Sequence, residues 1–110
     1  MHNDMGEFAE ARRLSEPAAE KGHPEAQHTL GSMHYHGDGG RPNLGKARRF
    51  LALAAAQGHA DAQILLGQMH YRGEGGSVDL SEAMRLYGLA AVQHFPEAQH
   101  NLGLMYYYGD

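Results

Sequence analysis

The sequence repeats with a period of 36 residues, and this repeat constrains the fold more than any other feature. Residues 22–57 and 58–93 align without a gap and are identical at 19 of 36 positions. Chance at ordinary composition would give roughly two or three identities. Residues 22–38 and 94–110 share 11 of 17 positions. Repeats of this length are typical of solenoids, in which each unit packs on its neighbours.

Each period contains two segments with helical spacing of apolar residues. The first segment reads PEAQHTLGSMHYH from Pro24, ADAQILLGQMHYR from Ala60 and PEAQHNLGLMYYY from Pro96. Its apolar residues recur at i, i+4 and i+7, and a proline followed by a carboxylate suits a helix start. The second segment follows a glycine-rich link, GDGGRP or GEGGSV, which we expect to be a turn.

These patterns predict an all-α fold, a right-handed α-α superhelix (α-solenoid) of 36-residue helix-turn-helix repeats. We expect about six helices, near residues 8–21, 24–36, 43–57, 60–72, 79–93 and 96–108. Residues 1–7 are expected to be a flexible N-terminus and residues 8–110 the repeat domain. Pro17 removes a backbone hydrogen bond inside the first helix, so we predict a kink or an early break there, with Ser15 capping a short restart.

Glycine inside a helix costs about 1 kcal/mol relative to alanine. Gly31, Gly67 and Gly103 occupy the same phase of the repeat within predicted helices, which indicates a packing reason. We expect another helix to pass close by, with the alanine pairs 54–55 and 90–91 as its contact residues. The remaining structural glycines are expected at helix ends and turns, at Gly37, Gly73 and Gly58.

Composition excludes several classes of function. The chain has no cysteine, which removes disulfides, thiolate metal sites and cysteine nucleophiles. A net charge of −4 gives no basic surface for nucleic acid. No apolar run reaches membrane-spanning length, and the N-terminus lacks the apolar core of a signal peptide. The glycine-rich links lack the Lys-Ser/Thr of a phosphate-binding loop, and no catalytic grouping stands out. We therefore expect neither an enzyme nor a cofactor.

The repeated pattern L-G-x-M-[HY]-x-x-G-x-G-G, followed by A-A-x-Q-G-H, resembles the Sel1-like repeat family, which is related to tetratricopeptide repeats. The resemblance covers residues 8–110. It implies an adaptor that scaffolds complexes or docks a protein or peptide, and a bacterial cytoplasmic or envelope location. Three departures from the family pattern are expected to loosen packing without removing the fold. They are His34 and His70 in place of tyrosine, which only Tyr106 keeps, Gly40 and Gly76 in place of valine, and Leu86 in place of the aromatic residue kept at Phe50.

The first helix of each repeat lines the concave surface of related arrays, so the same phase predicts a partner-binding groove. The predicted groove residues are Glu25, His28, Ser32, Tyr35, His36, Asp61, Ile64, Gln68, Tyr71, Arg72, Glu97, His100, Leu104, Tyr107 and Tyr108. Tyr35, Tyr71 and Tyr107 would form a ladder along this groove. Tyrosine suits binding surfaces, yet residues identical in every repeat also suit packing within the repeat. Both interpretations stay open at this point.

Nine histidines also raise the alternative of a metal- or small-ligand-binding regulatory domain. His34 and His36 form an H-x-H pair, but residues at i and i+2 on a helix do not share a face. Most histidines recur at equivalent positions of the repeat. Inheritance of the repeat explains this recurrence better than a single metal site does. We therefore predict no metal site. A non-catalytic fragment of a larger protein is a further alternative.

The last predicted helix, residues 96–108, is the first helix of its repeat. The sequence does not continue into the second helix of that repeat, which would cover it. Leu102, Met105 and Tyr106 are expected to be partly exposed there. Terminal repeats normally need polar caps. Two explanations compete, a longer array or a head-to-tail contact in which the first helix of one molecule covers the last helix of another.

Overall fold

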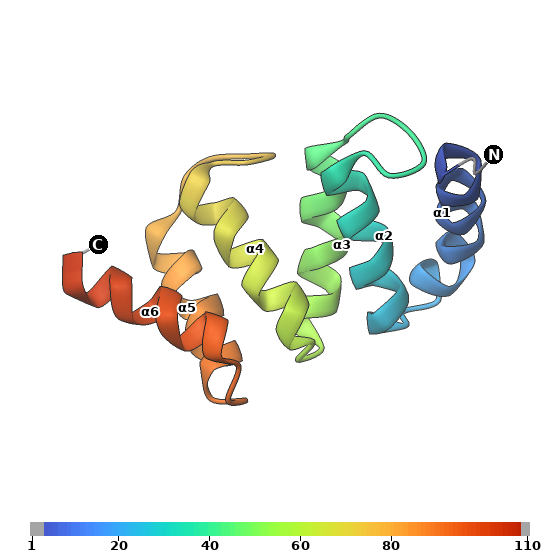
Figure 1. The fold of residues 1–110 in the computed structure, drawn as a ribbon. Helices are drawn as coiled ribbons and strands as arrows, with labels where there is room; N and C mark the ends of the chain where they lie inside the picture. Colours follow the sequence, from blue (N-terminus) through green and yellow to red (C-terminus); the bar gives the residue numbers. More distant parts are fainter. Residues whose placement is uncertain (1–3, 109–110) are drawn as a thin grey trace.

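A computed structural model describes residues 4–108, with side chains from residue 6, and shows six α-helices in a row (Figure 1). Their bounds are α1 Asp4–Glu20, α2 Pro24–His36, α3 Leu44–Ala56, α4 Ala60–Arg72, α5 Leu80–Ala91 and α6 Pro96–Tyr108. The most extensive contacts join helices adjacent in sequence, and the described residues span about 47 × 26 × 23 Å. The fold is therefore the expected all-α solenoid. No helix within residues 4–108 combines the length and apolarity needed to cross a membrane.

The first helix differs from its prediction in two ways. It begins at Asp4, so residues 4–7 are helical where a flexible segment was expected, and residues 1–3 lie outside the described part. It also runs without a break to Glu20 with Pro17 inside it, so the predicted early break and the restart capped by Ser15 are wrong. The helix continues past Pro17, where Lys21 N–H still donates to the Pro17 carbonyl at 3.0 Å.

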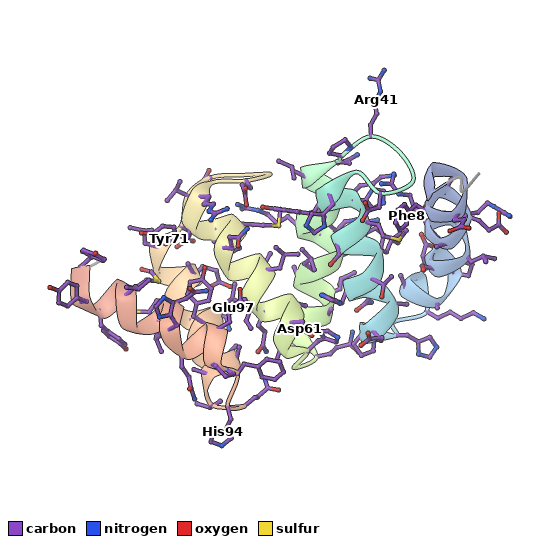
Figure 2. All side chains as sticks on the ribbon, in the orientation of Figure 1. Phe8, Arg41, Asp61, Tyr71, His94 and Glu97 are labelled. Atoms are coloured by element: carbon purple, nitrogen blue, oxygen red, sulfur yellow. The ribbon has the colours of Figure 1, made fainter. Side chains whose placement is uncertain are left out.

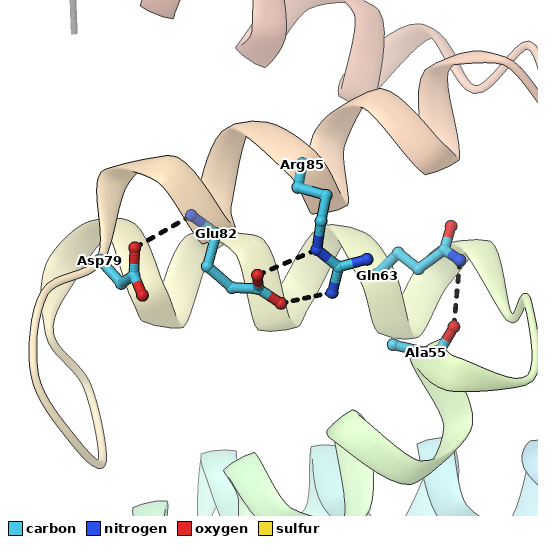
Figure 3. Close-up of polar contacts among 5 residues, drawn as sticks. All are labelled: Ala55, Gln63, Asp79, Glu82 and Arg85. Atoms are coloured by element: carbon cyan, nitrogen blue, oxygen red, sulfur yellow. Dashed lines mark hydrogen bonds and ion pairs between the residues drawn. The ribbon is translucent and has the colours of Figure 1, made fainter.

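The second helices of the repeats begin with matched side-chain caps. Asn43 Oδ1 accepts a hydrogen bond from Lys46 N–H at 3.0 Å, and Asp79 Oδ1 accepts one from Glu82 N–H at the same distance (Figure 3). Such caps satisfy backbone donors that have no partner within the helix. They place the first helical residues at 44 and 80, one residue later than the sequence pattern indicated.

The core runs along the contact between successive helices. Leu30, Leu51, Met69 and Leu86 are its largest fully buried side chains. Met105 of α6 also joins it, packed with Ala83, Tyr87 and Ala98. The expectation that Met105 would be exposed is therefore wrong, because α5 already covers that side of α6. Leu102 is half-buried and Tyr106 exposed, as expected.

Helical glycines give the close approaches that the sequence indicated, but with different partners. A β-carbon on Gly31 would lie 2.7 Å from Leu51 Cγ, and one on Gly67 would lie 2.8 Å from Tyr87 Cε1. The large side chains at positions 51 and 87, rather than the alanine pairs, fill the space beside these glycines. At Gly103 a β-carbon would meet nothing within 4 Å.

Positive backbone φ angles recur at the helix ends. Gly37 and Gly73 have φ of 79° and 73° at the C-caps of α2 and α4. Gly58, in the link after α3, has φ of 88°, while the same repeat position after α5 is His94, with φ of 68°. Glycine tolerates this conformation, whereas other L-residues are strained in it. His94 therefore occupies a glycine position, and Figure 2 places its side chain outside the helices.

Glutamine side chains connect successive helices in a regular pattern. The Nε2 groups of Gln27, Gln63 and Gln99 donate to the carbonyls of residues 19, 55 and 91, at 3.0, 3.1 and 3.3 Å; the Gln63 bond appears in Figure 3. Gln57 and Gln93 in turn donate to the Oε1 atoms of Gln27 and Gln63, at 2.7 and 3.0 Å. At Gln27 and Gln63 these bonds satisfy buried polar groups, and all of them connect a helix to the preceding one.

Candidate binding surface

The predicted groove residues lie on α2, α4 and α6, but the structure gives them different environments. Most are exposed or half-buried. Ile64 is 7% exposed and packs in the core with Tyr87 and Met105, so its assignment to the groove surface is wrong. Its apolar side chain faces the contact between helices, where burial is favourable.

The three tyrosines do not form an equivalent ladder. The Tyr35 hydroxyl lies 2.9 Å from both Glu74 carboxylate oxygens and accepts a bond from Gln68 Nε2 at 2.9 Å. Tyr35 therefore holds α2 to the end of α4 and the following turn. Tyr71 is 40% exposed and Tyr107 82% exposed. Tyr71 is accessible and also lines a pocket.

That pocket lies between α4, α5 and α6 and has a volume of about 200 Å³. Five of the predicted groove residues line it, together with Tyr87, Asn101 and Met105. The five are Gln68, Tyr71, Arg72, Leu104 and Tyr108. Tyr71 lies toward the C-terminal end of α4, and Asp61 lies toward its other end (Figure 2). The pocket therefore lies toward the C-terminal end of α4.

The pocket combines apolar walls with a few polar groups. Burial raises the pKa of Tyr87 to about 12, so its hydroxyl stays neutral at physiological pH. Within residues 4–108 no carboxylate forms an ion pair with the exposed Arg72 guanidinium. Arg72 can therefore bind an acidic group or a carbonyl of a partner. Asn101 and Gln68 add amide groups to the lining.

A second gathering of polar groups lies at the N-terminal ends of α2 and α4, where Glu25, His28 and His59 come together. His59 Nε2 lies 2.8 Å from Glu25 Oε1, and the two imidazole rings stack with centroids 4.6 Å apart. The hydrogen bond with His59 holds the pKa of Glu25 below its ordinary value, and burial lowers the pKa of His28. Glu25 and His28 are among the predicted groove residues, whereas His59 is not.

The H-x-H pair behaves as the helical spacing predicted. His34 is 4% exposed, while His36 is exposed and its Nδ1 lies 3.0 Å from the Ser32 carbonyl. His34 stacks on Phe50 with centroids 6.1 Å apart. The two histidines therefore face different environments and do not form a joint site.

Together, the stacked helix pairs define an α-solenoid. The family model of the Sel1 repeat matches residues 8–23, 24–59, 60–93 and 96–110. The chain belongs to the Sel1 repeat family, whose members are generally non-catalytic scaffolds that bind proteins.

Two solved structures are similar over most of the chain. One is c5321, a protective antigen present in uropathogenic Escherichia coli strains and displaying an SLR fold, with 34% identity and a TM-score of 0.84. The other is a Sel1 repeat protein from Oxalobacter formigenes, with 32% identity and a TM-score of 0.85. They cover 90% and 92% of this chain, which spans only 21% and 42% of theirs. No curated protein matches this chain.

Proposed function

We propose that this chain is a non-catalytic module that binds a protein or peptide in the groove of α2, α4 and α6. The pocket at Tyr71, Arg72 and Leu104 is the observation that carries the proposal. Its volume of about 200 Å³ falls below the roughly 300–1,000 Å³ of small-molecule sites. It suits a single anchoring side chain of a partner, and tyrosine and arginine are the residues enriched where binding energy concentrates.

The lining of the pocket supports a specific kind of ligand. Tyr71, Leu104 and Met105 offer an apolar surface, and beside it Arg72 offers a cation that no carboxylate of the described residues pairs. We infer that the partner inserts an apolar or aromatic side chain and places an acidic group or a backbone carbonyl against Arg72. An arginine-rich segment would instead meet Arg72 with like charge, which disfavours binding.

Pulldown from the source organism and selection from a displayed peptide library test this proposal. The Tyr71→Ala, Leu104→Ala double variant removes two pocket walls, and Tyr107→Ala is the matched control outside the pocket. We expect wild type and the control to recover the same partners and the double variant to lose them. If the double variant recovers every partner as well as the wild type does, the pocket is not the binding surface.

A contact between two copies of the chain is a second candidate, favoured by Leu14. Leu14 of α1 is 63% exposed, whereas the same repeat position is Phe50, 4% exposed, and Leu86, 1% exposed. Phe50 packs on His34, whose position in α6 is the exposed Tyr106. If α1 of one copy followed α6 of another as the next helix, Leu14 would cover Tyr106 and Ser15 would lie over Gly103.

Light scattering and sedimentation across a range of concentrations test this head-to-tail contact. We expect concentration-dependent association that Leu14→Asp abolishes. Leu53→Asp is the matched control, because Leu53 is an equally apolar exposed residue of α3 away from both end helices. A wild-type chain that stays monomeric at high concentration, or equal loss of association in both variants, would exclude this contact.

A further inference from the structure

The polar cluster between α2 and α4 has the composition of a metal site. Glu25, His28 and His59 each offer a ligand atom, and these three atoms lie within 4.8 Å of one another. Imidazole nitrogen and carboxylate oxygen are ordinary ligands of zinc, and three protein ligands leave a fourth position for water or a partner group. Within residues 4–108 this is the one such cluster. We propose that Glu25, His28 and His59 bind a divalent transition-metal ion, with Zn²⁺ the best match.

The backbone already brings the three ligands to one place. Glu25 and His28 are three positions apart on α2 and therefore share a face of that helix. His59 is the N-cap residue of α4, with an extended backbone that turns its ring back toward α2. The ion would thus join two consecutive repeats at the beginning of their first helices, and little movement is needed, because Glu25 and His59 are already in contact at 2.8 Å.

Charge and protonation suit the ligands for a cation. The pKa of Glu25 lies below its ordinary value, because of its hydrogen bond with His59, so its carboxylate is ionised at neutral pH. Burial lowers the pKa of His28, which favours its neutral ring. The carboxylate of Asp61 on α4 acts in the opposite direction and raises the pKa of His28. Neutral imidazole and ionised carboxylate are the forms that bind metals.

Coordination has one local cost, which gives the site a signature. Ala62 N–H donates to His59 Nδ1 at 3.2 Å, so in the metal-free protein the ring proton sits on Nε2 and points at Glu25. A metal bound at Nε2 replaces that proton, which moves to Nδ1. The ring then no longer accepts from Ala62 N–H. Metal uptake is therefore expected to change the Ala62 amide signal in NMR spectra.

The repeat supplies substitutions that the fold already accepts. The positions of His28 and His59 are occupied one repeat later by Ile64 and Phe95, so the junction between α4 and α6 lacks the cluster. His28→Ile and His59→Phe therefore install residues native to the equivalent positions. Glu25→Gln changes an exposed side chain and leaves the core untouched. Glu97 and His100 of α6 repeat the spacing of Glu25 and His28 without a third ligand in the cluster, which makes Glu97→Gln, His100→Ile the matched control.

The test is titration of the untagged chain with Zn²⁺ against a chromophoric chelator, with Co²⁺ absorption and the Ala62 amide signal as further readouts. We expect one equivalent bound, affinity reduced on the order of tenfold or more by each of the three single variants, and no change in the control. Circular dichroism checks that each variant is folded. Three outcomes would overturn the proposal: no saturable uptake by wild type, wild-type affinity in Glu25→Gln and both histidine variants, or an equal loss in the control.

Discussion

The guanidinium of Arg48 occupies the space that a side chain at Gly76 would need. A β-carbon on Gly76 would lie 2.5 Å from Arg48 Nη1. From this position Arg48 donates at 3.2 Å to the carbonyls of Met69, Glu74 and Ser77, at the end of α4 and in the turn after it. Glycine in place of the family's valine therefore does not leave a void here, because the side chain of Arg48 on α3 extends into the turn.

The same arrangement occurs one repeat earlier. A β-carbon on Gly40 would lie 2.6 Å from Arg12 Nη1, and Arg12 donates to the Met33 carbonyl at 3.0 Å. In α5, the corresponding residue is Met84. One of the three departures that suggested loose packing, glycine at positions 40 and 76, is thus part of an arginine contact that connects each turn to the preceding helix.

Arg48→Met and Gly76→Val should therefore be coupled. Each single variant is expected to lower the free energy of unfolding by about 1–3 kcal/mol, because the carbonyls that Arg48 serves lose their donor. The double variant should cost clearly less than the sum, since methionine leaves room for valine. Urea unfolding of the four proteins measures this coupling. Strictly additive losses would show that the two residues act independently.

Alanine should have opposite effects at equivalent helical glycines. Gly67→Ala is expected to lower the free energy of unfolding by about 1–3 kcal/mol, because the new β-carbon overlaps the ring of Tyr87. Gly103→Ala should raise it by about 1 kcal/mol, since it meets nothing within 4 Å and alanine favours the helix. Thermal and urea unfolding give both values. Two changes of the same sign would contradict the packing described for this phase.

His94→Gly should stabilise the protein. His94 has φ of 68° at a repeat position where glycine stands after α3, and a left-handed conformation costs an ordinary residue about 1–2 kcal/mol. Part of that gain is offset by the greater freedom of glycine in the unfolded chain, so we expect a net increase of about 0.5–1 kcal/mol. Gly58→Ala is the reciprocal variant and should lower stability. A lower melting temperature for His94→Gly would refute this account.

Stability should fall on acidification partly because of His34. Burial lowers the pKa of the His34 ring below 6.5, and the charges of Arg12, Lys46 and Arg49 lower it further, against the opposing carboxylate of Glu16. The unfolded chain then binds the proton more readily than the folded one. The contribution is fully present above pH 6.5 and is lost as the pH falls toward the folded-state pKa, with a slope of at most about 1.4 kcal/mol per pH unit.

The variant His34→Phe isolates this effect. Neither ring nitrogen of His34 has a hydrogen-bond partner among the described residues, so phenylalanine loses no polar contact and can pack on Phe50. We expect similar stability at pH 7.5 and a smaller loss than wild type between pH 6.5 and 5. Urea unfolding at several pH values measures both slopes. Parallel curves for the two proteins would show that His34 does not contribute.

Much of the fold could be predicted because the repeat reports the same structure several times. Pro24, Ala60 and Pro96 begin their helices where the aligned segments begin. Side-chain partners were harder to predict. The repeat shows which face of its helix a residue occupies, but it does not show which side chain of the neighbouring helix is long enough to contact that residue. The glycines at 31 and 67 meet Leu51 and Tyr87, whereas the smaller alanines lie elsewhere in the core.

The candidate sites show the same limit. Phase placed Tyr71, Arg72 and Leu104 on one surface, and they do share a pocket. Ile64 and His28 occupy the same position of the repeat, so both were predicted to lie on the groove surface. The apolar side chain of Ile64 packs into the core instead. The polar cluster went unrecognised because His59 lies 34 residues from Glu25 and belongs to the link before α4. Only the return of the chain to the preceding helix brings these two side chains together.

The glutamine bonds between helices have a consequence for how such a chain changes length. Gln27, Gln63 and Gln99 are 36 residues apart, and each donates to a carbonyl eight residues before it. Insertion or deletion of one whole period would leave an intact junction of the same kind on either side. A change of any other length between a glutamine and the carbonyl eight residues before it would leave the amide without its partner, and at Gln27 and Gln63 that amide is buried. Whole repeats are therefore units by which the array can lengthen or shorten while every junction keeps this bond.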